Sequence, residues 1–156
     1  MALVRILIDG YSLLHRWPEV AEGEPRHSAS ARDELLSILR QYGDATSTPI
    51  TIFFDGAGAP PGTPKQPSSR NLEILYSRAG QTADDMIERT AHRMKPYGEV
   101  LVVTDDIAES DIITGQGHLS CSCDNFIRDI GAALNDFSRD LDGYNQRERA
   151  RYKDRR

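Results

Sequence analysis

Three short apolar segments of this chain end in acidic residues, and this arrangement restricts the possible folds more than any other feature of the sequence. The segments are residues 3–8, 51–54 and 100–103, and the acids that follow them are Asp9, Asp55, Asp105 and Asp106. Segments of this length that are rich in branched apolar residues are typical of strands buried in a parallel sheet. Because open sheets of this kind carry their functional residues at the carboxyl ends of the strands, the pattern predicts a shared acidic site at one edge.

Segments with helical periodicity alternate with these strands. The residues that predict helix starts are Ser30 with Asp33, Thr82 with Asp85, and Asp106 with Glu109. Gly43 predicts the end of the first of these helices, and residues 126–141 carry a last apolar stripe. Residues 71–76 and 118–121 predict two further short strands. Strands and helices that alternate at this spacing predict a parallel sheet with helices on both faces.

The length and the cysteine content are typical of an intracellular domain. A chain of 156 residues is expected to form one domain that needs no disulfide or metal to fold. Its longest apolar runs have the length of strands, and no charged segment precedes a signal-like core, which predicts a cytoplasmic protein. Cys121 and Cys123 are separated by one residue and are expected to be buried and reduced.

The net charge of −5 is unevenly placed along the chain. Residues 145–156 contain six basic and two acidic residues, giving +4, whereas residues 1–144 contain 13 basic and 22 acidic residues, giving −9. We therefore divide the chain into a domain of residues 1–141 and a basic C-terminal tail of residues 142–156. Such a tail on an acidic, metal-binding body fits a protein that holds a polyanion partly through its end. A solvated helix end is the alternative interpretation.

Five aspartates are expected to gather at the functional edge of the sheet: Asp9, Asp84, Asp85, Asp105 and Asp106. Converging carboxylates repel one another unless a divalent cation lies between them, and oxygen ligands favour Mg²⁺ or Mn²⁺. Such an ion orients a water molecule and stabilises a phosphoryl oxygen. Acids also stabilise helix N-termini without binding metal, so capping is the alternative role for Asp84, Asp85 and Asp106. Asp9 is expected to cap no helix, because no helix start is evident after it.

Other catalytic classes lack their motifs in this chain. Ser12 lies in no G-x-S-x-G sequence, the four histidines show no metal-ligand spacing, and a phosphate-binding loop of the type G-x-x-x-x-G-K-[ST] is absent. Phospho-acceptor receiver domains also gather aspartates at strand ends. They need a lysine after the last strand, however, where this chain has Cys121-Ser122-Cys123.

Four stretches of the chain resemble the YacP-like branch of the NYN-domain ribonucleases, which are relatives of the PIN-domain nucleases. They are Ile8-Asp9-Gly10-Tyr11, Ile52-Phe53-Phe54-Asp55, Gly80 to Glu88, and Val102 to Gly117. The resemblance implies a three-layer α/β/α fold of the PIN-like (NYN) type with a central, mostly parallel sheet. It also implies metal-dependent endonucleolytic cleavage of RNA. It assigns metal binding and catalysis to Asp9, Asp84 and Asp106, with Asp85 and Asp55 as further acids.

Three positions depart from the family pattern. Ser12 stands where relatives usually have an asparagine, and it lacks the amide that would steady the first carboxylate. Asp105 stands where they usually have a serine and adds a charge to the site, so it joins the predicted metal ligands. Ser120 stands where an arginine is common, which removes a phosphate contact. These differences bear on the catalytic rate more than on the fold.

The sequence therefore predicts a cytoplasmic, Mg²⁺- or Mn²⁺-dependent endoribonuclease that hydrolyses RNA phosphodiester bonds, with a role in mRNA decay or at the ribosome. We expect single-stranded RNA as its partner and assign substrate contacts to Tyr11, Ser12, Arg16 and Arg78 by their position near the site. Ordinary surface residues are the alternative for the tyrosine and the two arginines. The alternative function is a non-catalytic RNA- or ribosome-binding module with a weakened site. The three core acids favour the enzyme, whereas Ser12 and Ser120 favour the module.

Overall fold

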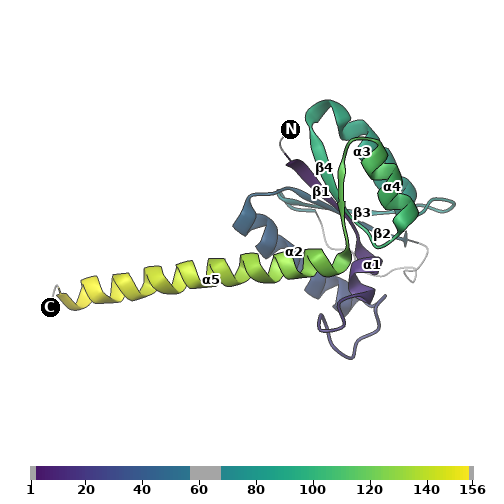
Figure 1. Ribbon diagram of the computed structural model, residues 1–156. Helices are drawn as coiled ribbons and strands as arrows, with labels where there is room; N and C mark the ends of the chain where they lie inside the picture. Colours follow the sequence, from purple (N-terminus) through teal and green to yellow (C-terminus); the bar gives the residue numbers. More distant parts are fainter. Residues whose placement is uncertain (1–2, 57–67, 155–156) are drawn as a thin grey trace.

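A single parallel sheet of five strands forms the centre of the molecule (Figure 1). The structure, a computed structural model, describes residues 3–56 and 68–154, and beyond residue 136 it describes the side chains of Arg147 and Arg149 alone. The strands are β1 (Leu3–Asp9), β2 (Ile50–Phe54), β3 (Leu72–Tyr76), β4 (Glu99–Val103) and β5 (Leu119–Cys121). Their order is β3-β2-β1-β4-β5, and each neighbouring pair is parallel. The prediction of a parallel sheet is confirmed.

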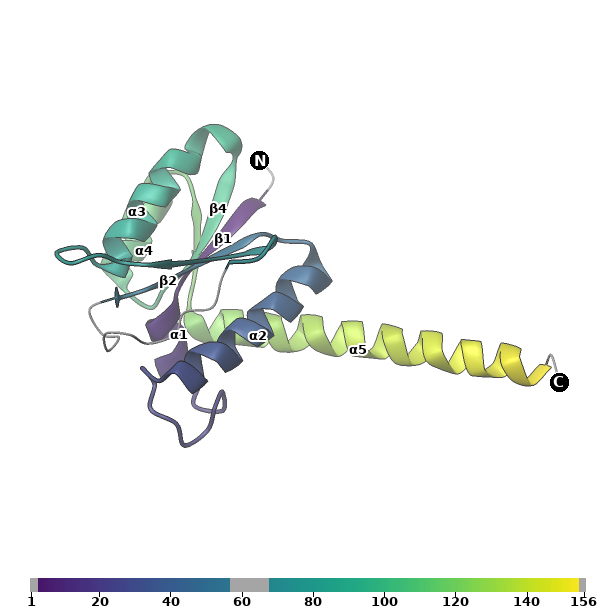
Figure 2. The same ribbon diagram turned by 180° about the vertical axis from the view of Figure 1, so that it is seen from behind.

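Helices cover both faces of this sheet. They are α1 (Gly10–His15), α2 (Ala29–Thr46), α3 (Ala83–Met94), a 3-10 turn (Lys95–Tyr97), α4 (Ile107–Gly115) and α5 (Cys123–Asp154). The helices α3 and α4 lie on one face, and α1, α2 and the first turns of α5 lie on the other (Figure 2). The three-layer α/β/α architecture is therefore confirmed. Of the helices in the described residues, none has both the length and the apolar composition that a membrane crossing needs.

The central strand β1 contributes side chains to both hydrophobic layers, because successive residues of a strand point to opposite faces. Ile6 and Ile8 are buried in the layer that α2 and α5 cover, and Leu7 is buried in the layer that α3 and α4 cover. Full burial of each such side chain contributes roughly 1.5–3 kcal/mol. The strand is thus held from both sides, and it delivers Asp9 to the carboxyl edge of the sheet between β2 and β4.

A helix begins directly after Asp9, so the expectation that this residue caps no helix was wrong. Asp9 is the N-cap of α1, and its Oδ1 accepts the backbone N–H of Ser12 at 3.3 Å. The helix is only six residues long, which is too short for an apolar stripe to reveal it. Gly10 is required at its first position, since a Cβ there would lie 2.3 Å from a ring carbon of Phe54.

The helix α2 begins earlier and ends later than its sequence pattern predicts. Ser28, not Ser30, is the N-cap, and its hydroxyl accepts the N–H of Ala31 at 3.1 Å. Gly43 lies inside the helix, where it allows a close approach to the following chain: a Cβ would lie 3.3 Å from the Thr48 carbonyl oxygen. The helix ends at Ser47, whose left-handed φ of 55° takes the place expected of a glycine.

His118 is a packing residue that links β4 to α3. Its Nδ1 accepts the backbone N–H of Val100 at 3.1 Å, and its Nε2 lies 2.7 Å from the carbonyl oxygen of Ala91. Because Nδ1 accepts, Nε2 carries the proton and donates it to the Ala91 carbonyl. Both ring nitrogens are therefore engaged in holding the fold.

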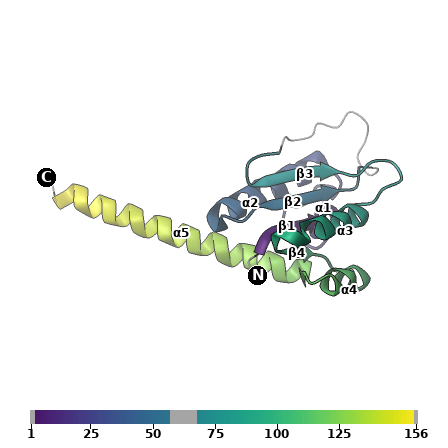
Figure 3. The same cartoon turned by 90° about the horizontal axis from the view of Figure 1, so that it is seen from above.

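The 32-residue helix α5 leaves the body of the molecule and ends far from the sheet (Figure 3). Its first turns pack against α2, where the rings of Tyr42 and Phe126 meet edge to face with centroids 5.5 Å apart. The backbone is helical across residues 141 and 142, where we divide the domain from the tail. Of the six basic tail residues, Arg147 and Arg149 are described and both are exposed; the others lie outside the described side chains.

Candidate metal centre

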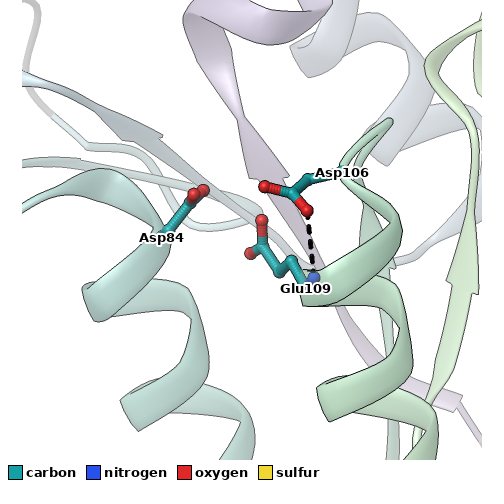
Figure 4. A group of neighbouring side chains, drawn as sticks. All are labelled: Asp84, Asp106 and Glu109. Atoms are coloured by element: carbon teal, nitrogen blue, oxygen red, sulfur yellow. Dashed lines mark hydrogen bonds between the residues drawn. The ribbon is translucent and has the colours of Figure 1, made fainter.

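Three carboxylates converge at the carboxyl edge of the sheet (Figure 4). Asp84 comes from the first turn of α3, Asp106 is the N-cap of α4, and Glu109 lies in the first turn of α4. One oxygen of each side chain lies within 4.8 Å of an oxygen of each of the others. Asp84 is half-buried, Asp106 is exposed and Glu109 is only 3% exposed. We call these three residues the acidic cluster.

Hydrogen bonds at the start of α4 fix the positions of two members of the cluster. Asp106 Oδ1 accepts the backbone N–H of Glu109 at 3.2 Å, which confirms the predicted helix start. The Thr104 hydroxyl, at the end of β4, donates to Glu109 Oε2 at 3.2 Å and accepts the N–H of Asp106 at 3.1 Å. Thr104, Asp106 and Glu109 therefore form one connected hydrogen-bond network. This network fixes the positions of the two carboxylates opposite Asp84 of α3.

Glu109 is the member whose environment most requires a proton or a cation. Burial is the main cause that raises its pKa to about 8, and the hydrogen bond and the negative charge of Asp84 raise it further. Its Oε1 is buried and has no hydrogen-bond donor among the described residues. A hydrogen bond between Glu109 and Asp84 exists only while one of the two carboxyl groups carries a proton. At neutral pH, then, Glu109 either keeps its proton or gives it up to a positive ion.

No described cation neutralises the cluster. The ion pairs between described residues both involve Arg16, which contacts Asp105 and Asp124. Three oxygen ligands at this separation, without a lysine or arginine among the described residues to balance them, form a donor set that suits a hard divalent ion.

Asp9 lies beside the cluster but outside the group of three. It is half-buried, and burial raises its pKa, with a further contribution from the negative charge of Asp84. The backbone N–H and the hydroxyl of Ser12 both hydrogen-bond its carboxylate and act in the opposite direction. Ser12 therefore steadies the first carboxylate despite its shorter side chain, and it is placed to orient Asp9.

The structure gives Asp85 and Asp105 partners away from the cluster. Asp85 Oδ2 accepts the N–H of Thr82 at 3.2 Å, and the Thr82 hydroxyl accepts the N–H of Asp85, so the predicted capping box is confirmed. Asp105 Oδ1 accepts the N–H of Cys123 at 2.9 Å and thereby holds the start of α5. Its Oδ2 lies 3.5 Å from the Arg16 guanidinium.

The residues assigned to substrate contacts occupy different environments. Tyr11 is buried, packs on His27 and Phe54, and its hydroxyl accepts a hydrogen bond from Arg32 at 3.3 Å. Arg16 is half-exposed but paired with Asp105 and Asp124, whereas Arg78 is exposed in the loop between β3 and α3. Asp55 accepts from the Ser77 hydroxyl at 3.2 Å at the end of β2.

Replacing Asp85 by alanine is expected to lower the free energy of unfolding by about 1 kcal/mol, because the N–H of Thr82 loses its acceptor. The measurement is urea denaturation in EDTA, together with Mn²⁺ titration of the folded protein. Asp84→Ala is the matched comparison on the same helical turn, since it is expected to weaken Mn²⁺ binding and to leave the capping box in place. Loss of metal binding by Asp85→Ala at unchanged stability would instead make Asp85 a ligand.

The family of the protein follows from comparison with known domains. A model of the YacP-like NYN domain family matches residues 6–156. The chain belongs to this family. The protein YacP of Bacillus subtilis (strain 168), described as uncharacterized, is 28% identical over 126 residues, which are 80% of this chain and 74% of that protein.

Two crystal structures of a Bacillus subtilis YacP-like protein, Rae1 (YacP), share the fold. One matches with a TM-score of 0.80 and 24% identity, covering 96% of this chain and 85% of the other. Its W164L mutant matches with a TM-score of 0.74 and 24% identity, covering 88% and 80% of the two chains. The three-layer architecture of this YacP-like NYN domain is thus the one seen in these structures.

Glu109 is the member of the cluster that sequence reasoning missed. The sequence pattern predicts it only as the partner of Asp106 at a helix start. The spacing held the signal nonetheless, because residues three apart on a helix lie on the same face, so Glu109 had to accompany Asp106 toward the same edge. The spacing does not predict the burial of Glu109, which raises its pKa and arises from packing in this YacP-like NYN domain.

Proposed function

We propose that this protein is a metal-dependent endoribonuclease. The observation that carries the proposal is the acidic cluster of Asp84, Asp106 and Glu109, with the buried, donorless Oε1 of Glu109, at the strand ends of a YacP-like NYN domain. A cluster that served helix capping alone would not need a buried third carboxylate that faces the other two. The role in RNA turnover rests on membership of this family.

The donor set favours Mg²⁺ or Mn²⁺, held by Asp84, Asp106 and Glu109, with Asp9 adding a nearby negative charge. A divalent cation at this position supplies Lewis-acid activation of the phosphate and of the attacking water.

The protein groups have distinct parts in this scheme. Thr104 positions Glu109 and the start of α4 through its two hydrogen bonds. The raised pKa of Glu109 favours a protonated carboxyl group in the metal-free site, and a bound cation would displace that proton. Asp9, at the end of β1, is hydrogen-bonded by Ser12 and lies close enough to Asp84 for the two charges to interact. Arg78, exposed between β3 and α3, is our candidate for holding a substrate phosphate.

Cleavage of a 5′-labelled, single-stranded RNA in Mg²⁺ or Mn²⁺ tests the proposal. We expect internal cuts that EDTA abolishes and that Asp84→Asn reduces by roughly 100-fold, the upper end of the loss seen when the support of a metal ligand is removed. Asp33→Asn, an exposed aspartate of α2 on the other face of the sheet, is the control and should cut normally. Wild-type protein that binds this RNA without cutting it in either metal would favour the RNA-binding module and overturn the proposal.

Truncation after Tyr144 is expected to flatten the salt dependence of RNA binding, because it removes all six basic residues of the tail. Each phosphate contact on a single strand contributes about 0.7 to the slope of log affinity against log salt, so six contacts account for at most about 4. The measurement is fluorescence anisotropy with a long RNA at several salt concentrations. Since surface ion pairs contribute little, an unchanged slope would identify the tail as a solvated helix end.

A further inference from the structure

A hollow of about 370 Å³ opens beside the acidic cluster, at the carboxyl ends of β4 and β5. We call it the β4–β5 pocket. Its wall includes Asp106, Ile107, Ser110, Ser120, Ser122 and Asn125. Because Asp106 belongs to both, a molecule in the pocket would lie directly next to a phosphate bound at the cluster. The volume is at the low end of the range of about 300–1,000 Å³ typical of small-molecule sites.

The lining of the pocket disfavours a phosphate. It contains no lysine or arginine, and its two acids are engaged elsewhere. Asp105 pairs with Arg16 and accepts the N–H of Cys123, while Asp106 accepts the N–H of Glu109 and is itself a member of the acidic cluster. Burial raises the pKa of the Cys121 thiol to about 11, so that part of the wall is neutral too. The pocket therefore suits an uncharged, polar ligand.

The polar groups of the pocket include free hydrogen-bond donors, and one of them, the amide NH₂ of Asn125, can only donate. The hydroxyls of Ser110 and Ser120 lie 2.5 Å apart, and only one hydrogen can lie between them, which leaves one O–H without an acceptor among the described residues. The Ser122 hydroxyl accepts the N–H of Asn125, which leaves its own O–H free. The amide oxygen of Asn125 accepts from Arg128, which leaves the NH₂ group as the available part.

An apolar side chain stands at the start of α4, beside these donors. Ile107 is 79% exposed, which is unusual for an isoleucine, and it lines the pocket. An exposed apolar group next to a set of hydrogen-bond donors matches a planar ring that carries acceptors on its edge.

We propose that the β4–β5 pocket holds the nucleoside next to the scissile phosphate of a single-stranded RNA and favours uracil and guanine. These bases present carbonyl oxygens where cytosine and adenine present amino groups, and carbonyl oxygens match the spare donors. The proposal rests on the proposed function, since it assumes an RNA phosphate at the acidic cluster. It adds base preference at one position and names Ser120 and Asn125 as the residues that determine it.

Binding to Asp84→Asn, which is expected to cut far more slowly than the wild type, tests the pocket without relying on turnover. Fluorescence anisotropy with labelled tetranucleotides that differ in one base should give several-fold tighter binding for uracil or guanine than for cytosine or adenine. One or two hydrogen bonds at about 1 kcal/mol each correspond to roughly 5- to 30-fold. In the same background, Ser120→Ala and Asn125→Ala should each reduce this preference, and Ser120→Leu should remove it by filling the pocket. Ser37→Ala and Ser37→Leu, at an exposed position of α2, are the matched controls.

The second experiment maps the cleavage sites of enzymes that retain Asp84. We expect cuts concentrated next to uracil and guanine, and spread over all bases in Ser120→Leu with the dependence on Mn²⁺ retained. Equal use of the four bases by the wild type, or an unchanged preference in both Ser120 variants, would overturn the pocket and leave the nuclease intact. Conversely, base preference in binding without any cleavage would retain the pocket and overturn the nuclease.

Discussion

Replacing Glu109 by glutamine is expected to make the metal-free protein more stable at pH 8 and to remove the loss of stability that Glu109 causes between about pH 5 and pH 8. The pKa of Glu109 is about 8 in the folded protein, against 4.5 for an ordinary glutamate. The folded state therefore binds more protons than the unfolded state between these two values, and stability is lost as the pH rises through that window. The loss approaches 1.4 kcal/mol per pH unit where the difference is one full proton. Glutamine keeps the hydrogen bond from Thr104 but carries no charge to bury.

Urea denaturation in EDTA at pH 5, 6, 7 and 8 measures this effect. Glu34→Gln, an exposed glutamate of α2, is the control and should follow the wild type. Mn²⁺ should restore stability to the wild type at pH 8 by mass action, and much less to Glu109→Gln. Parallel pH profiles for the wild type and Glu109→Gln would show that Glu109 is not held in the environment described here.

Replacing Asp9 by asparagine is expected to reduce RNA cleavage by roughly 10- to 100-fold while the fold stays intact. Asparagine is as good an N-cap as aspartate, so the N–H of Ser12 keeps an acceptor and α1 keeps its start. The negative charge behind Asp84 is lost, which should weaken the hold on a cation and the orientation of the site. The metal-free variant should be at least as stable as the wild type, because one member of a group of repelling carboxylates becomes neutral.

The measurement is the single-turnover cleavage rate in saturating Mn²⁺, with the melting temperature recorded in EDTA. Asp111→Asn, an exposed aspartate of α4, controls for the loss of one surface charge. Normal cleavage by Asp9→Asn would remove Asp9 from the site. An unfolded variant would instead show that its carboxylate, and not its capping geometry, holds α1 in place.

The edge at which the chemistry lies could be predicted because strand ends are visible in the sequence. The apolar runs before Asp9 and Asp106 place their carboxyl ends together in any parallel sheet, and a capping box marked the start of α3 near Asp84. These are local patterns with fixed spacing. They predict which strands and helices meet at the site, but not which acid at each strand end points into it.

Which acid points into the site depends on packing between elements that are distant in sequence. Asp105 and Asp106 are neighbours in the chain, yet the first turns toward Arg16 and the start of α5 while the second faces α3. Tyr11 lies two residues after Asp9 but is buried, and its hydroxyl accepts a hydrogen bond from the buried Arg32 of α2. Neither outcome has a signal in local spacing, since each requires the position of a side chain more than ten residues away.

The projection of α5 sets a minimum length for a substrate that engages both ends of the molecule. The helix begins where Cys123 contacts Asp105, next to the β4–β5 pocket, and Arg149 lies about 39 Å further along at 1.5 Å per residue. An oligonucleotide shorter than this span can occupy the acidic cluster or touch the distal arginines, but not both. Short and long RNAs should consequently respond differently to the loss of the distal turns, and the ratio of their affinities measures how far the bound strand follows the helix.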